Sequence, residues 1–305
     1  MSEPKKQHIV PKCYLKHFVD PNTPKNHEPY VWVFDKKGKK GKKRSPKNTF
    51  TQTDIYTLKV LEEGKDYSIE KNLSQIEGEY SSVFENKIKK HLPLSTEEHV
   101  ILCAFVAAML QRTLKQKRHI EGMLDQMIKR VEVMEKARNL PPKKSLELKK
   151  EKENAHAMSL ASSLPSVTAT LVKMNVAFLC SKSKNSFITS DNPCYLFNSQ
   201  MQWQRIYSPD LNQRNVEVRM PLSPEITVDF SWVNNLRGYL AFEPDMIHEL
   251  NRATYNNADG HFIARSPKLK RRWFRRHPID PVFLFKMFRS YLRHRRIKKY
   301  HERRN

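Results

Sequence analysis

Four polar residues in this 305-residue sequence have the side-chain types that acid–base and phosphate chemistry require: His8, Glu77, Arg112 and Asp191. An imidazole titrates near neutral pH and can therefore accept or donate a proton during a reaction. A guanidinium binds a phosphate or a carboxylate through two parallel hydrogen bonds. Carboxylates act as proton acceptors or hold divalent metal ions. We predict that these four residues converge in one catalytic site.

Two glutamates add a metal hypothesis. Glu70 and Glu77 are seven residues apart, which is two helical turns, so they lie on one face of a predicted helix. Together with Asp191 they could bind a divalent metal ion, whose identity the sequence does not specify. The alternative is a solvated acidic stripe that pairs with neighbouring lysines.

The other candidates also have structural interpretations. His8 can bond a backbone carbonyl and so fix the N-terminal segment. Arg112 follows the apolar stretch at 100–110 and can pair with Glu70 or Glu77 at a buried helix junction. Asp191 precedes Asn192-Pro193, a typical turn sequence in which the carboxylate caps backbone N–H groups. Both interpretations remain open for each residue.

The periodicity of the apolar residues predicts the elements that carry these candidates. A strand at 30–34 is followed by the basic run 36–47, which we predict to be a long hairpin loop, and by a weak strand near 54–58. Apolar residues then recur every three or four positions from about residue 68. Ser95 begins a second helix that we expect to reach His119 and to extend toward Arg138. A further helix is expected over 143–172.

Short strands follow this helical section, and helices are expected at 244–258 and, with a basic amphipathic pattern, at 278–301. This order predicts an α+β fold. A helical middle section packs with a mixed or antiparallel sheet built from N-terminal and C-terminal strands, and a basic C-terminal helix is added. The predicted strands are 176–179, 187–189, 195–197, 216–220 and 226–230.

Positive charge is concentrated in two segments. The chain has 56 Lys and Arg against 32 Asp and Glu, a net charge of +24. Residues 36–47 contribute +8 and residues 266–305 contribute +13, so the rest of the chain carries only +3. Such segments bind polyanions. We predict nucleic acid, RNA or DNA, as the partner, with an anionic membrane surface or a protein as alternatives. The predicted polyanion-binding residues are Lys39, Lys40, Lys42, Lys43, Arg44, Lys270, Arg271, Arg272, Arg275, Arg276, Arg293, Arg295 and Arg296.

Several protein classes lack support. The sequence contains no phosphate-binding glycine loop of the P-loop or Rossmann type. Its four cysteines are scattered without a C-x-x-C pair, which argues against a zinc ribbon or a disulfide framework. The longest strongly apolar stretch, 100–110, is too short to span a bilayer. The N-terminal residues lack an apolar segment typical of a secretory signal. We therefore expect a cytoplasmic protein.

Several motifs occur in a characteristic order: HIVPKCYLKHF at 8–18, VWVFDK at 31–36, FITSDNPC at 187–194 and LNRATYNNADGHFIAR at 250–265. With them, the chain resembles a mainly microbial family catalogued as domain of unknown function 4238. The resemblance covers about residues 8–265 and implies one domain, 1–265, followed by a basic tail, 266–305. It names no activity. The positions that match the family pattern are His8, Pro11, Glu70, Glu77, Gln111, Arg112, Asp191 and Pro193.

These observations lead to a functional hypothesis. We expect a nucleic-acid-binding protein that acts as a nuclease-like effector of a microbial toxin or antiviral defence system. In this hypothesis the basic segments hold the polyanion, Arg112 holds a phosphate, and His8 acts with the acids. One alternative is a non-catalytic nucleic-acid-binding module. Another is a membrane-surface protein anchored by the amphipathic tail.

Overall fold

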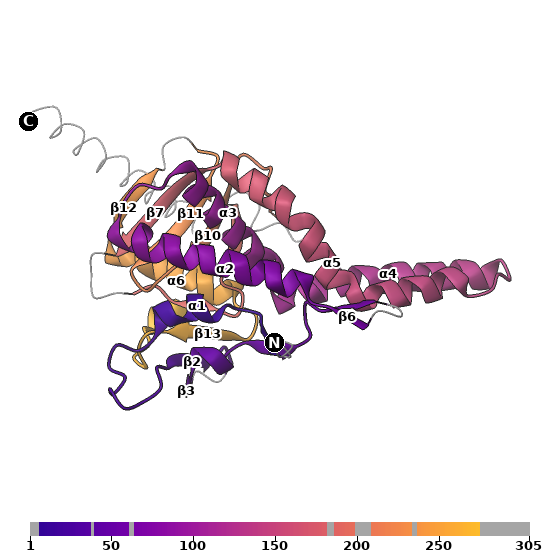
Figure 1. Cartoon of the computed structure of the whole chain (residues 1–305), viewed down its shortest axis with the longest axis horizontal. Coiled ribbons are helices and arrows are strands. Elements are labelled where there is room, and N and C mark those ends of the chain that lie inside the picture. The colour runs from indigo at the N-terminus through magenta and orange to yellow at the C-terminus, as the bar shows by residue number, and fades with distance from the viewer. Residues whose placement is uncertain are drawn as a thin grey trace, which may run out of the picture.

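A computed structural model of the chain describes residues 6–37, 40–60, 64–181, 186–198, 209–233 and 237–274. It confirms the α+β fold, with a helical middle section and sheets formed by strands from both ends of the chain (Figure 1). The predicted basic helix at 278–301 lies outside the described residues. The main core joins the long helices to the larger sheet.

The larger sheet has five strands in the order β12 (Gly238–Phe242), β7 (Asn175–Ser181), β11 (Ile226–Ser231), β10 (Val216–Pro221) and β9 (Tyr195–Asn198). It is mixed, because β12 runs parallel to β7 while the other pairs are antiparallel. Alternate residues of β7 face opposite sides, as strand geometry requires. Phe178 and Cys180 join the main core, whereas Ala177 and Leu179 pack against the helix α6 (Pro244–Asn257).

The second sheet is antiparallel and has the order β3 (Gly41–Arg44), β2 (Val31–Asp35), β13 (His261–Ala264) and β8 (Thr189–Ser190). The basic run at 36–47 is therefore not one long loop, because its middle pairs with β2 as an edge strand. Gly41 permits this pairing: a Cβ atom there would lie 2.6 Å from the Phe34 ring.

Two small sheets flank these. β1 (Lys6–His8) pairs with β4 (Thr51–Thr53), and β5 (Leu58–Val60) pairs with β6 (Gly64–Asp66). The weak strand predicted near 54–58 is mostly the turn between β4 and β5, and Asp54 has a left-handed φ of 51° there. The short helical turns are α1 (Lys12–Leu15), η1 (Lys16–Phe18), η2 (Pro46–Asn48) and η3 (Ile88–Lys90).

The long helices are α2 (Ser68–Asn86), α3 (Thr96–Gln111), α4 (Leu114–Ala137) and α5 (Lys143–Lys173). Ser95 forms the expected N-cap of α3, in a reciprocal capping box with Glu98. The apolar stretch at 100–110 forms the buried part of α3. Among the described helices, none has the length and apolar character needed to cross a membrane.

The prediction of one continuous helix from Ser95 past His119 is wrong. Helix α3 ends at Gln111 with Arg112 as its C-cap, and Thr113 adopts an extended conformation with a ψ of 154°. The Thr113 hydroxyl accepts the backbone N–H of Gln116 and so caps a new helix, α4. The carbonyl of Arg112 instead accepts the hydroxyl of Tyr56 at 2.7 Å. This break places Arg112 at a helix junction.

Helices α4 and α5 form a long hairpin that projects from the body (Figure 1). Near the body, α5 packs against α3. At the C-terminal side, the turn η4 (Arg271–Phe274) packs on α6. Its Trp273 is buried, and the indole Nε1 lies 2.9 Å from Nδ1 of His248. The first residues of the predicted tail are thus attached to the body by aromatic contacts.

Candidate functional site

The candidate site is built around Arg112, whose side chain is only 1% exposed at the α3–α4 junction. Its Nη1 donates to Oε1 of Glu77 at 2.7 Å, and its Nη2 donates to the carbonyl oxygen of His8. The guanidinium lies 5.4 Å from the centre of the Tyr56 ring. A buried cation is costly unless it is paired and hydrogen-bonded. Arg112 therefore joins the N-terminal strand, α2 and the α3–α4 junction into one unit.

Glu70 lies on the same face of α2 as Glu77, as its spacing predicted. Burial raises the pKa of the Glu70 carboxyl to about 7, Arg112 opposes this rise, and the charge of Glu77 adds to it. One of its oxygens, Oε2, is buried without a hydrogen-bond partner. Glu70 is thus a carboxyl group that can hold or release a proton near neutral pH.

His8 and Cys13 complete this group, which we call the Arg112 centre (His8, Cys13, Glu70, Glu77 and Arg112). Burial lowers the pKa of His8, although the charge of Glu77 raises it. Its Nε2 lies 3.2 Å from the carbonyl oxygen of Lys47, so this nitrogen donates a hydrogen bond and the imidazole Nδ1 remains as an acceptor. Burial raises the pKa of Cys13 to about 11, which keeps the thiol protonated and weakly nucleophilic.

The structure therefore brings together three of the four predicted catalytic residues, His8, Glu77 and Arg112. The geometry of Arg112 matches its structural interpretation, because the enclosed guanidinium binds an internal carboxylate. An enclosed guanidinium cannot hold the phosphate of an external substrate. Arg112 is a positioning residue, and the other four residues of the centre, His8, Cys13, Glu70 and Glu77, are all of intermediate exposure.

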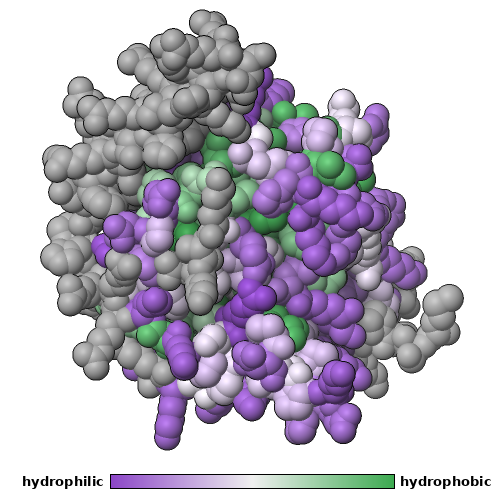
Figure 2. Space-filling view, turned by 90° about the vertical axis from the view of Figure 1, so that its left-hand side faces the viewer, coloured by the Kyte–Doolittle hydropathy of each residue, from purple (hydrophilic) through white to green (hydrophobic). Residues whose placement is uncertain are grey.

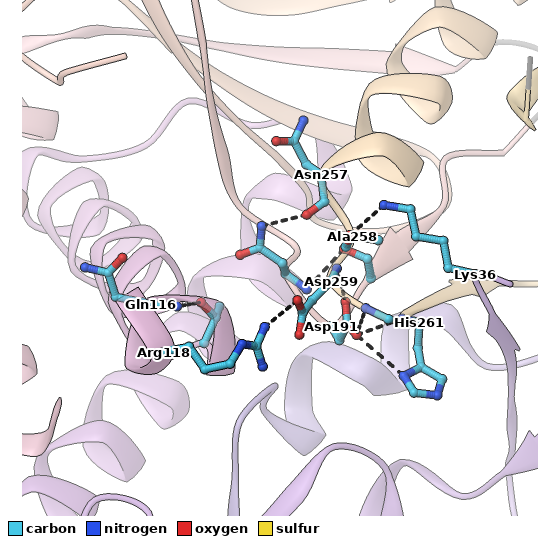
Figure 3. A network of polar contacts seen from close by, with 12 residues as sticks. Lys36, Gln116, Arg118, Asp191, Asn257, Ala258, Asp259 and His261 are labelled. Atoms are coloured by element: carbon cyan, nitrogen blue, oxygen red, sulfur yellow. Dashed lines mark hydrogen bonds and ion pairs between the residues drawn. The ribbon is translucent and has the colours of Figure 1, made fainter. Parts of the chain in front are cut away.

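Asp191 belongs to a different network (Figure 3). Its Oδ1 accepts the backbone N–H of Asp259 at 2.8 Å, and its Oδ2 accepts those of Gly260 at 2.8 Å and His261 at 2.7 Å. The Asp259 carboxylate in turn pairs with Arg118 of α4. Asp191 thus closes the connection between α6 and β13, as expected for an aspartate that caps backbone N–H groups.

The residues predicted to bind metal do not form a coordination group. Within the described part of the chain, no three His, Cys, Asp or Glu side chains are placed to hold a metal ion. Glu77 receives its positive counter-charge from Arg112 instead. Asp191 is engaged by three N–H groups elsewhere.

A basic hollow of about 200 Å³ lies on the second sheet. Lys40, Lys42 and Arg44 line it together with His261 and Phe50. Alternate residues of a strand share one face, which explains why Lys42 and Arg44 of β3 point the same way, while Lys40 immediately precedes this strand. Lys43 points elsewhere, with its Nζ 4.5 Å from the centre of the Tyr30 ring. We call this site the β3 hollow; its remaining lining residues are Val33, Asp35 and Thr49.

The charges of the β3 hollow are exposed and available. Lys40, Lys42 and Arg44 are all exposed, and no ion pair joins them to an acid of the described chain. The β3 hollow is connected to the Arg112 centre through β4. His8 of the centre pairs with Thr51, whose chain neighbour Phe50 lines the hollow. Of the other residues predicted to bind polyanions, Lys270 is exposed. The side chains of Lys39, Arg271, Arg272, Arg275, Arg276, Arg293, Arg295 and Arg296 lie outside the described residues.

A larger hollow of about 590 Å³ has a different charge balance. Its lining includes Lys89, which pairs with Glu85 at 2.7 Å, and Arg265, which pairs with Glu225. These ion pairs neutralise most of its charge, so this hollow has less attraction for a polyanion than the β3 hollow.

Another buried charge cluster lies on the larger sheet and was not predicted as a site. Arg219 of β10 donates from Nε to Oδ1 of Asp229 on β11 at 3.0 Å and also pairs with Glu217. Burial raises the pKa of Asp229, and the nearby Glu217 adds to this rise. The sequence shows Arg219 and Glu217 two residues apart, but Asp229 joins them only through the pairing of the two strands.

The family model described as Protein of unknown function (DUF4238) matches residues 6–268. The chain belongs to the DUF4238 family. No curated protein and no solved structure matches the chain. The DUF4238 match covers both the Arg112 centre and the β3 hollow, and it extends past Asp191 to the beginning of the basic C-terminal segment.

Two residues that support the centre carried no signal in the sequence. Gln7 is fully buried, and its side chain accepts the backbone N–H of Tyr56 at 2.7 Å and donates to Thr57 at 2.8 Å. Tyr56 reaches the Arg112 carbonyl across 56 positions of the chain. Neither residue lies in a periodic pattern or a motif, because both act through contacts between distant segments.

Proposed function

We propose that this protein binds nucleic acid, RNA or DNA, through the β3 hollow. The observation that carries the proposal is that three exposed bases, Lys40, Lys42 and Arg44, line one hollow and form no ion pair with an acid of the described chain. Backbone phosphates are the ligands that such a group of exposed cations fits, and each neutralised phosphate releases a counterion.

The other lining residues support the same ligand. Phe50 offers an aromatic face, on which a base can stack in a sequence-tolerant way. His261 lies beside it, with a ring-to-ring distance of 6.0 Å. Positive charge beside aromatic rings is typical of proteins that bind single-stranded nucleic acid. In this proposal the predicted bases of the C-terminal segment also contribute to binding the polyanion.

The Arg112 centre favours a second, narrower proposal, which is cleavage of the bound strand. Burial raises the pKa of Glu70 to about 7, and the charge of Glu77 on the same face of α2 adds to this rise. His8, which contacts the carbonyl of Lys47, connects this centre to the segment that lines the β3 hollow. In this proposal Glu70 and His8 transfer protons, and Arg112 holds the segments that carry them. The protein would act in the cytoplasm as a nuclease-like effector of a microbial toxin or antiviral defence system. In the non-catalytic alternative, the β3 hollow binds nucleic acid and the bound strand is not cleaved.

Binding is tested with a triple variant, Lys40→Gln, Lys42→Gln and Arg44→Gln. Fluorescence anisotropy with labelled single-stranded RNA and DNA should show a loss of affinity of about tenfold or more. The slope of log affinity against log salt concentration should become less steep by about 2 to 3. A matched control, Lys71→Gln, Lys90→Gln and Lys115→Gln, removes the same charge from exposed positions outside the hollow. If the hollow variant and the control variant bind RNA and DNA with equal affinity, the β3 hollow is not the binding site.

Cleavage is tested separately by incubating the full chain with RNA and DNA, with and without Mg²⁺ or Mn²⁺. Glu70→Gln should abolish cleavage while leaving anisotropy-detected binding intact. The control Glu79→Gln changes an exposed glutamate of the same helix. Binding without any cleavage would refute the nuclease step and leave the nucleic-acid-binding proposal standing.

A further inference from the structure

The distal end of the α4–α5 hairpin exposes large apolar side chains. Val133, Met134, Leu140 and Leu146 are 68%, 53%, 54% and 51% exposed, respectively. They lie within the last turn of α4, the connection and the first turns of α5. In contrast, the end of the molecule opposite the hairpin is mostly hydrophilic where it is described (Figure 2). We call residues 129–150 the hairpin tip.

The hairpin tip is held in one conformation by local hydrogen bonds. Asn139 has a left-handed φ of 50°, and the N–H of Leu140 donates to the carbonyl of Glu135 at 2.9 Å. This pattern is a Schellman motif, which ends α4. The Glu135 carboxylate then accepts the backbone N–H groups of Lys144 at 2.8 Å and Ser145 at 3.1 Å, which caps α5. The apolar side chains are therefore presented by a well-defined turn.

Basic side chains surround these apolar residues. The hairpin tip contains eight Lys and Arg against three glutamates. Two of the bases are neutralised in part, since Lys149 pairs with Glu132 and Lys144 pairs with Glu147. The other six are exposed, and none forms an ion pair with an acid of the described chain. These six are Lys129, Arg130, Lys136, Arg138, Lys143 and Lys150.

We propose that the hairpin tip docks onto an anionic phospholipid surface. Lipid headgroups supply the negative charge that six unpaired bases require, and Val133 and Leu140 can enter the interface between headgroups and acyl chains. A second copy of the chain would bring like charges together. Nucleic acid would meet the bases but would leave the four aliphatic side chains without apolar contacts. The end of a projecting hairpin is also narrow, whereas a stable protein interface needs about 1,000 Å² or more.

The proposal is tested first with an environment-sensitive fluorophore, NBD, attached to Leu140→Cys in the full chain. The control position is Met158→Cys, which is 58% exposed on the same hairpin but outside the tip. On phosphatidylcholine vesicles that contain phosphatidylserine, we expect a blue shift and increased emission at position 140 only. No spectral change at position 140 overturns the proposal, even if the protein binds the vesicles, because attachment through other basic residues would not bury this side chain.

A second test removes the apolar contact without changing charge. Val133→Ser with Leu140→Ser should reduce flotation with phosphatidylserine-containing vesicles at least fivefold, while Met158→Ser should leave it unchanged. The affinity for single-stranded RNA or DNA should stay within twofold of the wild type in both variants, so this result is distinguishable from a failure of the nucleic-acid proposal. Equal flotation of the wild type and the double variant would overturn the docking proposal. A loss of nucleic-acid affinity as large as the loss of flotation would also overturn it.

Discussion

Arg112 and Arg44 carry the same guanidinium group, but their surroundings give them opposite roles. Arg112 is 1% exposed and binds Glu77 and the His8 carbonyl, whereas Arg44 is exposed beside two lysines and pairs with no described acid. The comparison separates two uses of positive charge. A buried cation that pairs with an internal carboxylate holds segments of the fold together, even though the Nε of Arg112 has no hydrogen-bond partner. An exposed group of unpaired cations is free to bind an external anion.

The largest effect should come from Arg112→Met, which keeps much of the side-chain volume and removes the charge. Glu77 and the carbonyl of His8 lose their donors, so the free energy of unfolding should fall by about 3–5 kcal/mol. Urea denaturation followed by circular dichroism measures this loss. Arg118→Met is the control, because Arg118 is 56% exposed in its ion pair and should lose about 1 kcal/mol at most. Equal losses would contradict the contrast between the two sites.

Asp191→Ala should have the next largest effect, because three backbone N–H groups lose their acceptor. We expect a loss of about 2–3 kcal/mol in unfolding free energy, with hydrogen exchange increasing first in the connection between α6 and β13. Asp259→Ala removes only a carboxylate that pairs with an exposed arginine and should cost less than about 1 kcal/mol. If Asp191→Ala is as stable as the wild type and abolishes a measurable activity, Asp191 is catalytic instead.

The pH dependence of stability should reveal Glu70. Folding raises the pKa of this carboxyl from 4.5 to about 7. Between these values the folded state holds a proton that the unfolded state has lost, so stability falls as pH rises through this window. Ionisation of Glu70 should lower the free energy of unfolding by about 1–2 kcal/mol across this window, because partial exposure reduces the effect of the pKa shift. Glu70→Gln should remove this contribution and become more stable than the wild type above pH 7. An unchanged pH profile in Glu70→Gln would show that Glu70 is ionised in the folded protein at neutral pH.

The smallest effect on stability should come from the β3 hollow. Lys42→Gln with Arg44→Gln removes two exposed charges that have no described ion pair. The unfolding free energy should therefore change by less than about 0.5 kcal/mol, while nucleic-acid affinity falls. Thermal unfolding and anisotropy on the same samples measure both quantities. A stability loss comparable to that of Arg112→Met would mean that the hollow is structural.

Elements with a strong local signal were predictable. The capping residue Ser95 and the apolar stretch at 100–110 fixed the beginning and the burial of α3, because both effects act within a few residues. The basic run at 36–47 was wrongly predicted as a loop, because its residues have little intrinsic strand preference. Pairing with β2 makes Gly41–Arg44 a strand nevertheless. The end of α3 at Gln111 was also not predicted, because Thr113 is a modest signal beside many helix-forming residues.

The candidate site was predictable in its residue types and only partly in its grouping. Helical spacing placed Glu70 and Glu77 on one face, and pairing of Arg112 with one of these glutamates was the structural alternative to its predicted phosphate-binding role. The separation of Asp191 from them followed from the α6–β13 connection, which no spacing in the sequence reveals. The contribution of Tyr56 and Gln7 depended on side-chain packing between segments distant in the chain.

The sequence by itself determined the α+β class, the concentration of charge in two segments and the membership in the DUF4238 family. These properties arise from composition, local periodicity and the order of motifs, which do not depend on how distant segments meet. Only the tertiary structure decided which charges are buried and which are free. Burial is a property of packing between segments, so it made Arg112 an internal partner of Glu77 and left Lys40, Lys42 and Arg44 exposed around a hollow.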